Sequence, residues 1–168
     1  GGSQIWSGQV IEMELSSQLI IKTRIMTTPQ HLSAHFKGVY FGPNWTLSNL
    51  KDTLSDVNYL EATQQVDDFN TIAKLVYHIH YFVRVAIPVL KGEELKGDDK
   101  ESFDVPEITS EKQWQDMLST YYSEAQEMID LIESLPEEKM NEAFWDARYK
   151  TYFYNLNGTI EHTHYHLG

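Results

Sequence analysis

The sequence has 168 residues, no cysteine and a formal net charge of −12 at pH 7. Hydrophobic content of 41% and charged content of 23% are ordinary for a globular protein, and the length predicts a single domain over residues 1–168. Without cysteine there are no disulfides and no thiolate ligands, so any metal must be held by His, Asp or Glu. The acidic charge argues against nucleic acid and anionic membrane surfaces as partners.

The chain shows no targeting or membrane-spanning signal. Gly1-Gly2-Ser3 has neither the basic region nor the apolar core of a signal peptide. We expect residues 1–13 to be disordered or a remnant of recombinant expression. No apolar run approaches the roughly 20 residues of a transmembrane helix. Together with the lack of disulfides, this favours a cytoplasmic location.

The N-terminal part of the chain has two stretches with helical features. From about Glu14 on, apolar residues recur without a clean period, and we predict a helix there. Thr28-Pro29 supplies an N-cap followed by proline at the first helical position, which predicts that a helix restarts. Its apolar positions are Leu32, Phe36, Val39 and Tyr40. The cluster at 42–44 ends it, and residues 44–68 are expected to form short helical turns and loops.

A long apolar helix is predicted over residues 71–91. Asp67, Asp68 and Asn70 are its candidate N-caps, and Gly92 terminates it. The following segment, residues 92–108, is rich in Gly, Asp, Glu and Lys, which predicts a solvated linker.

Two further helices complete the predicted fold. Thr109 or Ser110 caps one that runs to about Leu135, with the cleanest amphipathic period in the chain. A charged connection follows, and the last helix begins near Thr151. Strand signals are sparse. Four amphipathic helices with a long connection between the second and third predict an all-α fold, an antiparallel up-down four-helix bundle.

The last helix carries the most suggestive chemistry. His162 and His166 stand four residues apart, so a helix places both imidazoles on one face, where they can share a metal ion. His164 projects about 200° away from His162 and cannot join that ion from the same helix. Glu161 is adjacent and is a weak candidate for a catalytic base. A polar helix end that binds nothing is the alternative.

A third ligand could come from the helix over residues 71–91. His78 and His80 flank its main apolar stripe on opposite sides, and His78 has the more apolar neighbours, a mild preference. A histidine among apolar residues must satisfy its ring nitrogens by a hydrogen bond or by metal. The pair His31 and His35 also stands four apart, and spacing alone does not exclude it.

Two motifs resemble a known family. The run Leu75-Val76-Tyr77-His78-Ile79-His80-Tyr81 resembles the second-helix histidine motif of DinB-like proteins, and the ending 157–168 resembles their C-terminal His-x-x-x-His-x-Gly motif. Trp45-Thr46 and the segment around Trp114 are also similar to one branch of the family. The resemblance covers most of the chain from about residue 18. Family members usually continue past the final glycine, whereas this sequence stops at Gly168.

The resemblance implies an up-down four-helix bundle with a three-histidine metal site on its inner side. Carried over by position, the ligands are His78, His162 and His166, and His31 with His35 becomes a surface pair. Three neutral imidazoles leave coordination positions open for water or substrate, which is the catalytic pattern. We expect a divalent ion, zinc or nickel before others, whose binding weakens below pH about 6.5.

The resemblance further implies a metal-dependent hydrolase, or a transferase that uses a low-molecular-weight thiol, acting on a small molecule. The alternative is a bundle that binds metal or ligand without catalysis. The resemblance also suggests a homodimer, which the aromatic residues outside the main stripes could serve. These are Trp45, Tyr59 and Trp145.

Overall fold

The computed structural model describes residues 25–168, and these residues are helical throughout their regular structure. The expectations for residues 1–13 and for a helix from Glu14 on fall mainly outside the described residues. Within residues 25–168 no strand forms, apart from one isolated bridge between Ala143 and Thr151. The all-helical prediction is therefore confirmed for this part of the chain.

Six α-helices and three short 3-10 helices follow one another in the described part of the chain. The α-helices are α1 (Thr28–Phe41), α2 (Leu50–Thr53), α3 (Tyr59–Thr63), α4 (Ile72–Leu90), α5 (Glu111–Glu133) and α6 (Tyr152–Leu167). The 3-10 helices are η1 (Asp99–Phe103), η2 (Glu137–Asn141) and η3 (Ala147–Tyr149). No helix within residues 25–168 is long and apolar enough to cross a membrane.

The four long helices all begin at a hydroxyl side chain that caps the first turn. In each, the cap oxygen accepts a hydrogen bond from a backbone N–H three residues on, which satisfies one of the free donors of the first turn. The caps are Thr27, Thr71, Ser110 and Thr151. The prediction of Thr28 as a cap is thus wrong by one residue, because Thr27 forms a capping box with Gln30. For α4 the cap is Thr71 itself, and none of the three earlier candidates.

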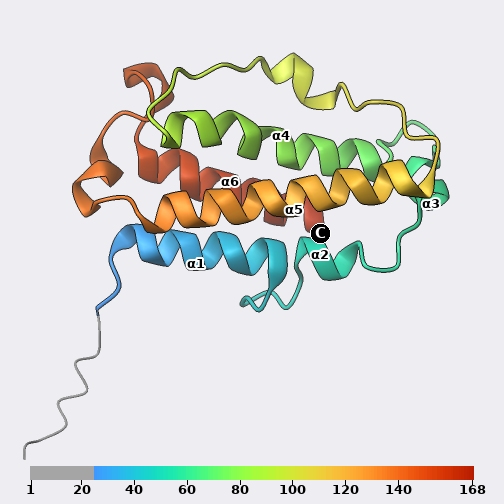
Figure 1. The fold of residues 1–168 in the computed structure, drawn as a ribbon, viewed down its shortest axis with the longest axis horizontal. Coiled ribbons are helices and arrows are strands. Elements are labelled where there is room, and N and C mark those ends of the chain that lie inside the picture. The colour runs from blue at the N-terminus through green and yellow to red at the C-terminus, as the bar shows by residue number, and fades with distance from the viewer. Residues whose placement is uncertain (1–24) are drawn as a thin grey trace, which may run out of the picture.

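The long helices lie alongside one another and share one core (Figure 1). α5 and α6 each contact both α1 and α4. Trp114 of α5 is fully buried, and its indole N–H donates to the carbonyl of Val57 at 2.8 Å, which ties the loop before α3 to the core. This arrangement turns one face of α6 toward α4, and that contact carries the site.

The connection between α4 and α5 differs from the predicted solvated linker. It runs along α4, as Figure 1 shows above that helix, and its η1 turn packs against α4. Ser102 in this turn is only 1% exposed. The charged residues of the segment still face solvent, so the composition describes its outer side, whereas Ser102 and Phe103 contact the helix.

Candidate metal centre

Three histidines from two helices bring their ring nitrogens together. His78 lies on α4, and His162 and His166 lie one turn apart on α6. The Nε2 atom of His162 is 3.0 Å from Nε2 of His78 and 3.1 Å from Nε2 of His166. Within residues 25–168, no other group of three His, Asp or Glu side chains has an arrangement that could hold a metal ion.

These separations fit three ligands around one cation. A tetrahedral ion bound at about 2.0–2.1 Å separates two ligand nitrogens by about 3.3 Å. Hydrogen bonds alone satisfy the cluster poorly, because Nε2 of His162 faces two other ring nitrogens and carries at most one proton. Three converging lone pairs therefore suit a metal ion better than they suit one another.

Ser102 fixes which nitrogen of His78 is free to bind. The Ser102 hydroxyl donates its single hydrogen to the Asp99 carbonyl at 2.6 Å, so its oxygen accepts from the His78 Nδ1–H at 3.0 Å. With its proton on Nδ1, the neutral imidazole presents a bare lone pair at Nε2. This is the usual second-shell arrangement of a metal-binding histidine.

Burial keeps the cluster neutral. Burial, and after it the neighbouring His166 and His78, lower the pKa of His162 from 6.5 to about 4. Burial also lowers the pKa of His78 and of His166. Neutral imidazole is the form that binds a metal. The lowered pKa values extend that form to pH values below the expected limit of about 6.5.

The metal-free protein should consequently lose stability as the pH falls from 6.5 toward 4. Over this window the unfolded chain takes up a proton at position 162 and the folded chain does not, so the free energy of unfolding decreases with decreasing pH. Chemical denaturation of the chelator-treated protein at several pH values measures this slope. A His162→Gln variant removes the group while the carboxylates titrate as before. Equal slopes in the two proteins would contradict the expectation.

Aromatic rings enclose the histidines. The ring of Phe103 stacks on His78 with centroids 3.9 Å apart and an interplanar angle of 8°. Phe82 meets the edges of both His78 and His162, at 5.3 and 4.8 Å. Nδ1 of His162 is buried and has no hydrogen-bond partner among residues 25–168.

Sequence reasoning missed Ser102 and Phe103, because it assigned residues 92–108 to solvent. A signal was present. Phe103 is a lone aromatic residue in a charged stretch, and Asp98 is an N-cap that marks a short helical turn. Neither feature states which helix the turn contacts.

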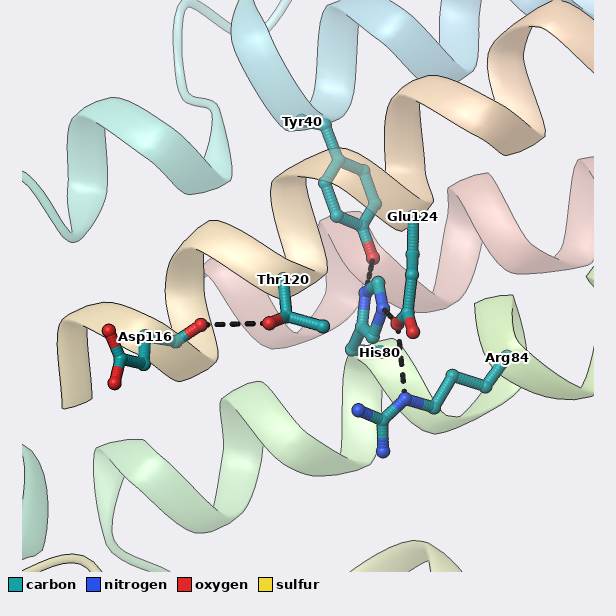
Figure 2. Close-up of polar contacts among 6 residues, drawn as sticks. All are labelled: Tyr40, His80, Arg84, Asp116, Thr120 and Glu124. Carbon is teal, nitrogen blue, oxygen red and sulfur yellow. Dashed lines mark hydrogen bonds and ion pairs between the residues drawn. The ribbon is translucent and has the colours of Figure 1, made fainter. Parts of the chain in front are cut away.

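His80 belongs to a separate, fully paired network (Figure 2). Its ring is 0% exposed, with Nε2 2.6 Å from Glu124 and Nδ1 3.3 Å from the Tyr40 hydroxyl. Arg84 donates to the same Glu124 oxygen at 3.1 Å. Both ring nitrogens of His80 are thus occupied within the protein, and His80 stays apart from the three-histidine cluster.

The remaining candidates from the sequence lie elsewhere. His31 and His35 are exposed on α1, and His164 is half-buried on α6. Glu161 is exposed, and its carboxylate accepts a hydrogen bond from Asn157 at 2.7 Å. The structure groups none of these side chains with the three histidines.

A cavity adjoins the cluster at His162. Its volume is about 390 Å³, and it extends between α4, α6, η3 and the connection after α4. Five of its lining residues are aromatic, namely Tyr81, Phe82, Phe144, Tyr149 and Tyr154. A mostly apolar pocket beside converging polar groups is the usual form of a small-molecule site.

Comparison with known proteins shows the family to which the chain belongs. No curated protein and no solved structure matches the sequence. A family model, that of the DinB superfamily, matches residues 44–168, a range that includes all three clustered histidines. The match covers well over half of the sequence, and the chain belongs to the DinB superfamily.

Proposed function

We propose that the protein is a metal-dependent enzyme that acts on a small molecule, with His78, His162 and His166 as the ligands of one divalent ion. The observation that carries this proposal is the convergence of three Nε2 atoms beside a cavity. Imidazole ligands suit zinc or nickel. The reaction classes are hydrolysis and thiol-dependent transfer.

The chain's own groups prepare the site for such chemistry. When bound, the ion supplies Lewis acidity, which polarises a carbonyl group or makes a thiol more acidic. Ser102 holds the His78 ring in the tautomer that leaves Nε2 free. Phe82 packs against His78 and His162, and Phe103 stacks on His78, which limits the contact of these rings with water and strengthens electrostatic interactions there.

A screen of reactions tests the proposal. The metal-loaded protein is assayed with small thiols and electrophilic acceptors, and in parallel with ester and amide substrates. Turnover that disappears in His78→Ala, His162→Ala and His166→Ala supports the enzyme. Turnover that persists in these variants at equal metal loading would contradict it.

A non-catalytic metal- or ligand-binding bundle is the second candidate. One observation favours it: no carboxylate within residues 25–168 joins the histidine cluster, and Glu161 is bonded to Asn157. No general acid or base is then present among the clustered side chains themselves. Stoichiometric metal with no turnover across the screen would support this reading.

The setting of the site is also part of the proposal. We propose a single domain whose long helices run up and down in antiparallel order, a cytoplasmic location and a homodimer. Support for the dimer comes from exposed aromatic surface, since Trp45 is 98% and Trp145 43% exposed, while Tyr59 is half-buried. Exposed tryptophans are common at interfaces.

Replacing Ser102 by alanine should weaken metal binding by about 10- to 100-fold, the usual cost of losing a second-shell partner. The variant frees the His78 ring to rotate and to carry its proton on Nε2. Titration with zinc against a competing chelator measures the change. Ser134→Ala is a matched control, because its hydroxyl also donates to a backbone carbonyl, at 2.8 Å, on an exposed helix end. Equal affinities in the two variants would contradict the role of Ser102.

A further inference from the structure

The charges of the residues that line the cavity beside His162 limit which ligands it can bind. Asp99 is the only charged residue among the described residues that line it, and none of them is Lys or Arg. The rest of its wall is aromatic, aliphatic or small and polar. In the metal-free protein, an anionic ligand would therefore meet a carboxylate and no permanently positive side chain.

The polar side chains of the cavity wall donate most of their hydrogen bonds to other groups of the protein. Asn155 donates through its amide nitrogen to the carbonyls of Tyr149 and Thr151, so its side-chain oxygen remains as an acceptor. The Thr159 hydroxyl donates to the Asn155 carbonyl at 2.9 Å. These groups can accept hydrogen bonds from a ligand, but they have little left to donate.

Tyr81 holds one side of the cavity in place. Its hydroxyl accepts from the Asp98 N–H at 2.8 Å and lies 3.0 Å from the Asp98 carbonyl and 3.2 Å from the Glu101 carboxylate. These contacts tie the connection after α4 to that helix and bring the Glu101 carboxylate near the wall. One cation also lies nearby: the Arg148 guanidinium is 5.6 Å from the Tyr149 ring, but it is paired with Asp146 at 2.6 Å.

Aromatic faces next to a carboxylate favour a cation. A positive charge over an aromatic ring is attracted by the ring quadrupole, and aromatic walls are the known means of binding quaternary ammonium groups. Tyr149 and Tyr154 are 41% and 63% exposed, so their rings are available at the mouth of the cavity. The overall charge of −12 acts in the same direction.

We propose that this cavity binds a cationic small molecule with an aromatic body, and that this is the substrate class of the metal site. The assignment as substrate rests on the proposed function, whereas binding in the cavity does not.

Three probes that share a 1-naphthylmethyl group and differ in charge test the proposal. They are (1-naphthylmethyl)trimethylammonium, 1-naphthalenemethanol and 1-naphthylmethanesulfonate. The ammonium has no lone pair to coordinate a metal, and the sulfonate is a weak ligand. Calorimetry on the full, chelator-treated chain at one ionic strength should give a Kd for the ammonium that is about tenfold lower than for the sulfonate, with the alcohol between them.

Gly158 supplies a variant that fills the cavity. It lines the cavity, and a Cβ at this position would meet no heavy atom within 4 Å, so Gly158→Leu extends into open space and suits the helix. It should weaken all three probes by at least about tenfold while metal content is retained, and Gly158→Ala is its matched control. Non-specific attraction to an acidic protein would be unaffected by Gly158→Leu.

A second variant replaces an exposed side chain, so it should not disturb the packing of the helix. Tyr154→Leu, at an exposed position, should reduce the affinity for the ammonium by about fivefold and change the alcohol less. Tighter binding of the sulfonate than of the ammonium overturns the proposal. So does unchanged binding to folded Gly158→Leu. Absence of metal from the wild-type protein with intact probe binding would instead overturn the proposed function alone.

Discussion

The His162→Ala variant is expected to lose its metal, with the affinity for zinc or nickel falling by more than about 100-fold. Even a lost second-shell partner costs about 10- to 100-fold, and His162 is the central ligand of the cluster. Its Nε2 is the atom within 3.0–3.1 Å of both other histidines. Elemental analysis of the purified protein and competition with a chelator give stoichiometry and affinity.

The same helix offers a control. His164→Ala removes a half-buried imidazole two residues away that faces another direction, and it should retain full metal content. His78→Ala and His166→Ala should behave like His162→Ala. Retention of metal by all three variants would refute the site, and loss of metal in His31→Ala would move it to α1.

The His80→Leu variant is expected to lower the free energy of unfolding by about 3 kcal/mol, which corresponds to a decrease in Tm of roughly 6–12 °C. Leucine has a similar size, so packing changes little. The loss arises because the Glu124 carboxylate and the Tyr40 hydroxyl are left without their partner in the core (Figure 2).

The direction of each hydrogen bond in this network follows from the protonation states. Burial raises the pKa of Tyr40, so its hydroxyl keeps its proton and donates to His80 Nδ1. Burial lowers the pKa of His80, against the opposing effect of Glu124, so the ring is neutral and donates from Nε2. The hydrogen bond from His80, and then that from Arg84, lowers the pKa of Glu124 and keeps it ionised.

A double-mutant cycle tests this coupling. Glu124→Leu in the His80→Leu background also removes the carboxylate that has lost its hydrogen bond from His80, so the double variant should lose less stability than the sum of the single variants. Arg84→Met should cost under about 1 kcal/mol, since its side chain is 41% exposed and screened by solvent. Additive single and double effects, or a loss below about 0.5 kcal/mol for His80→Leu, would show that the network does not stabilise the core.

Local features of the sequence determined the helices. Hydroxyl caps, apolar periods and terminating residues are read within a few neighbours along the chain. They predicted a helix over residues 71–91, and the structure has α4 at Ile72–Leu90. They also predicted a helix capped by Thr109 or Ser110 that runs to about Leu135, and the structure has α5 at Glu111–Glu133. The spacing of His162 and His166 is local in the same sense, because any helix puts residues four apart on one face.

Tertiary structure decided between His78 and His80. Periodicity gives the direction of each side chain around α4, but it does not state which neighbouring element each direction meets. The face of His80 meets Tyr40 of α1 and Glu124 of α5, which satisfy both ring nitrogens. The face of His78 meets α6, where two more histidines converge.

The role of the connection after α4 was likewise beyond the sequence. Its composition reports that most of its residues are solvated, and that is true of its outer side. Its inner side places Ser102 on the His78 ring, a contact across 24 residues that no local pattern encodes. The sequence by itself determined the helices and the histidine pair of α6. The packing of α4, α6 and η1 decided which third imidazole joins that pair, because only packing determines which faces meet.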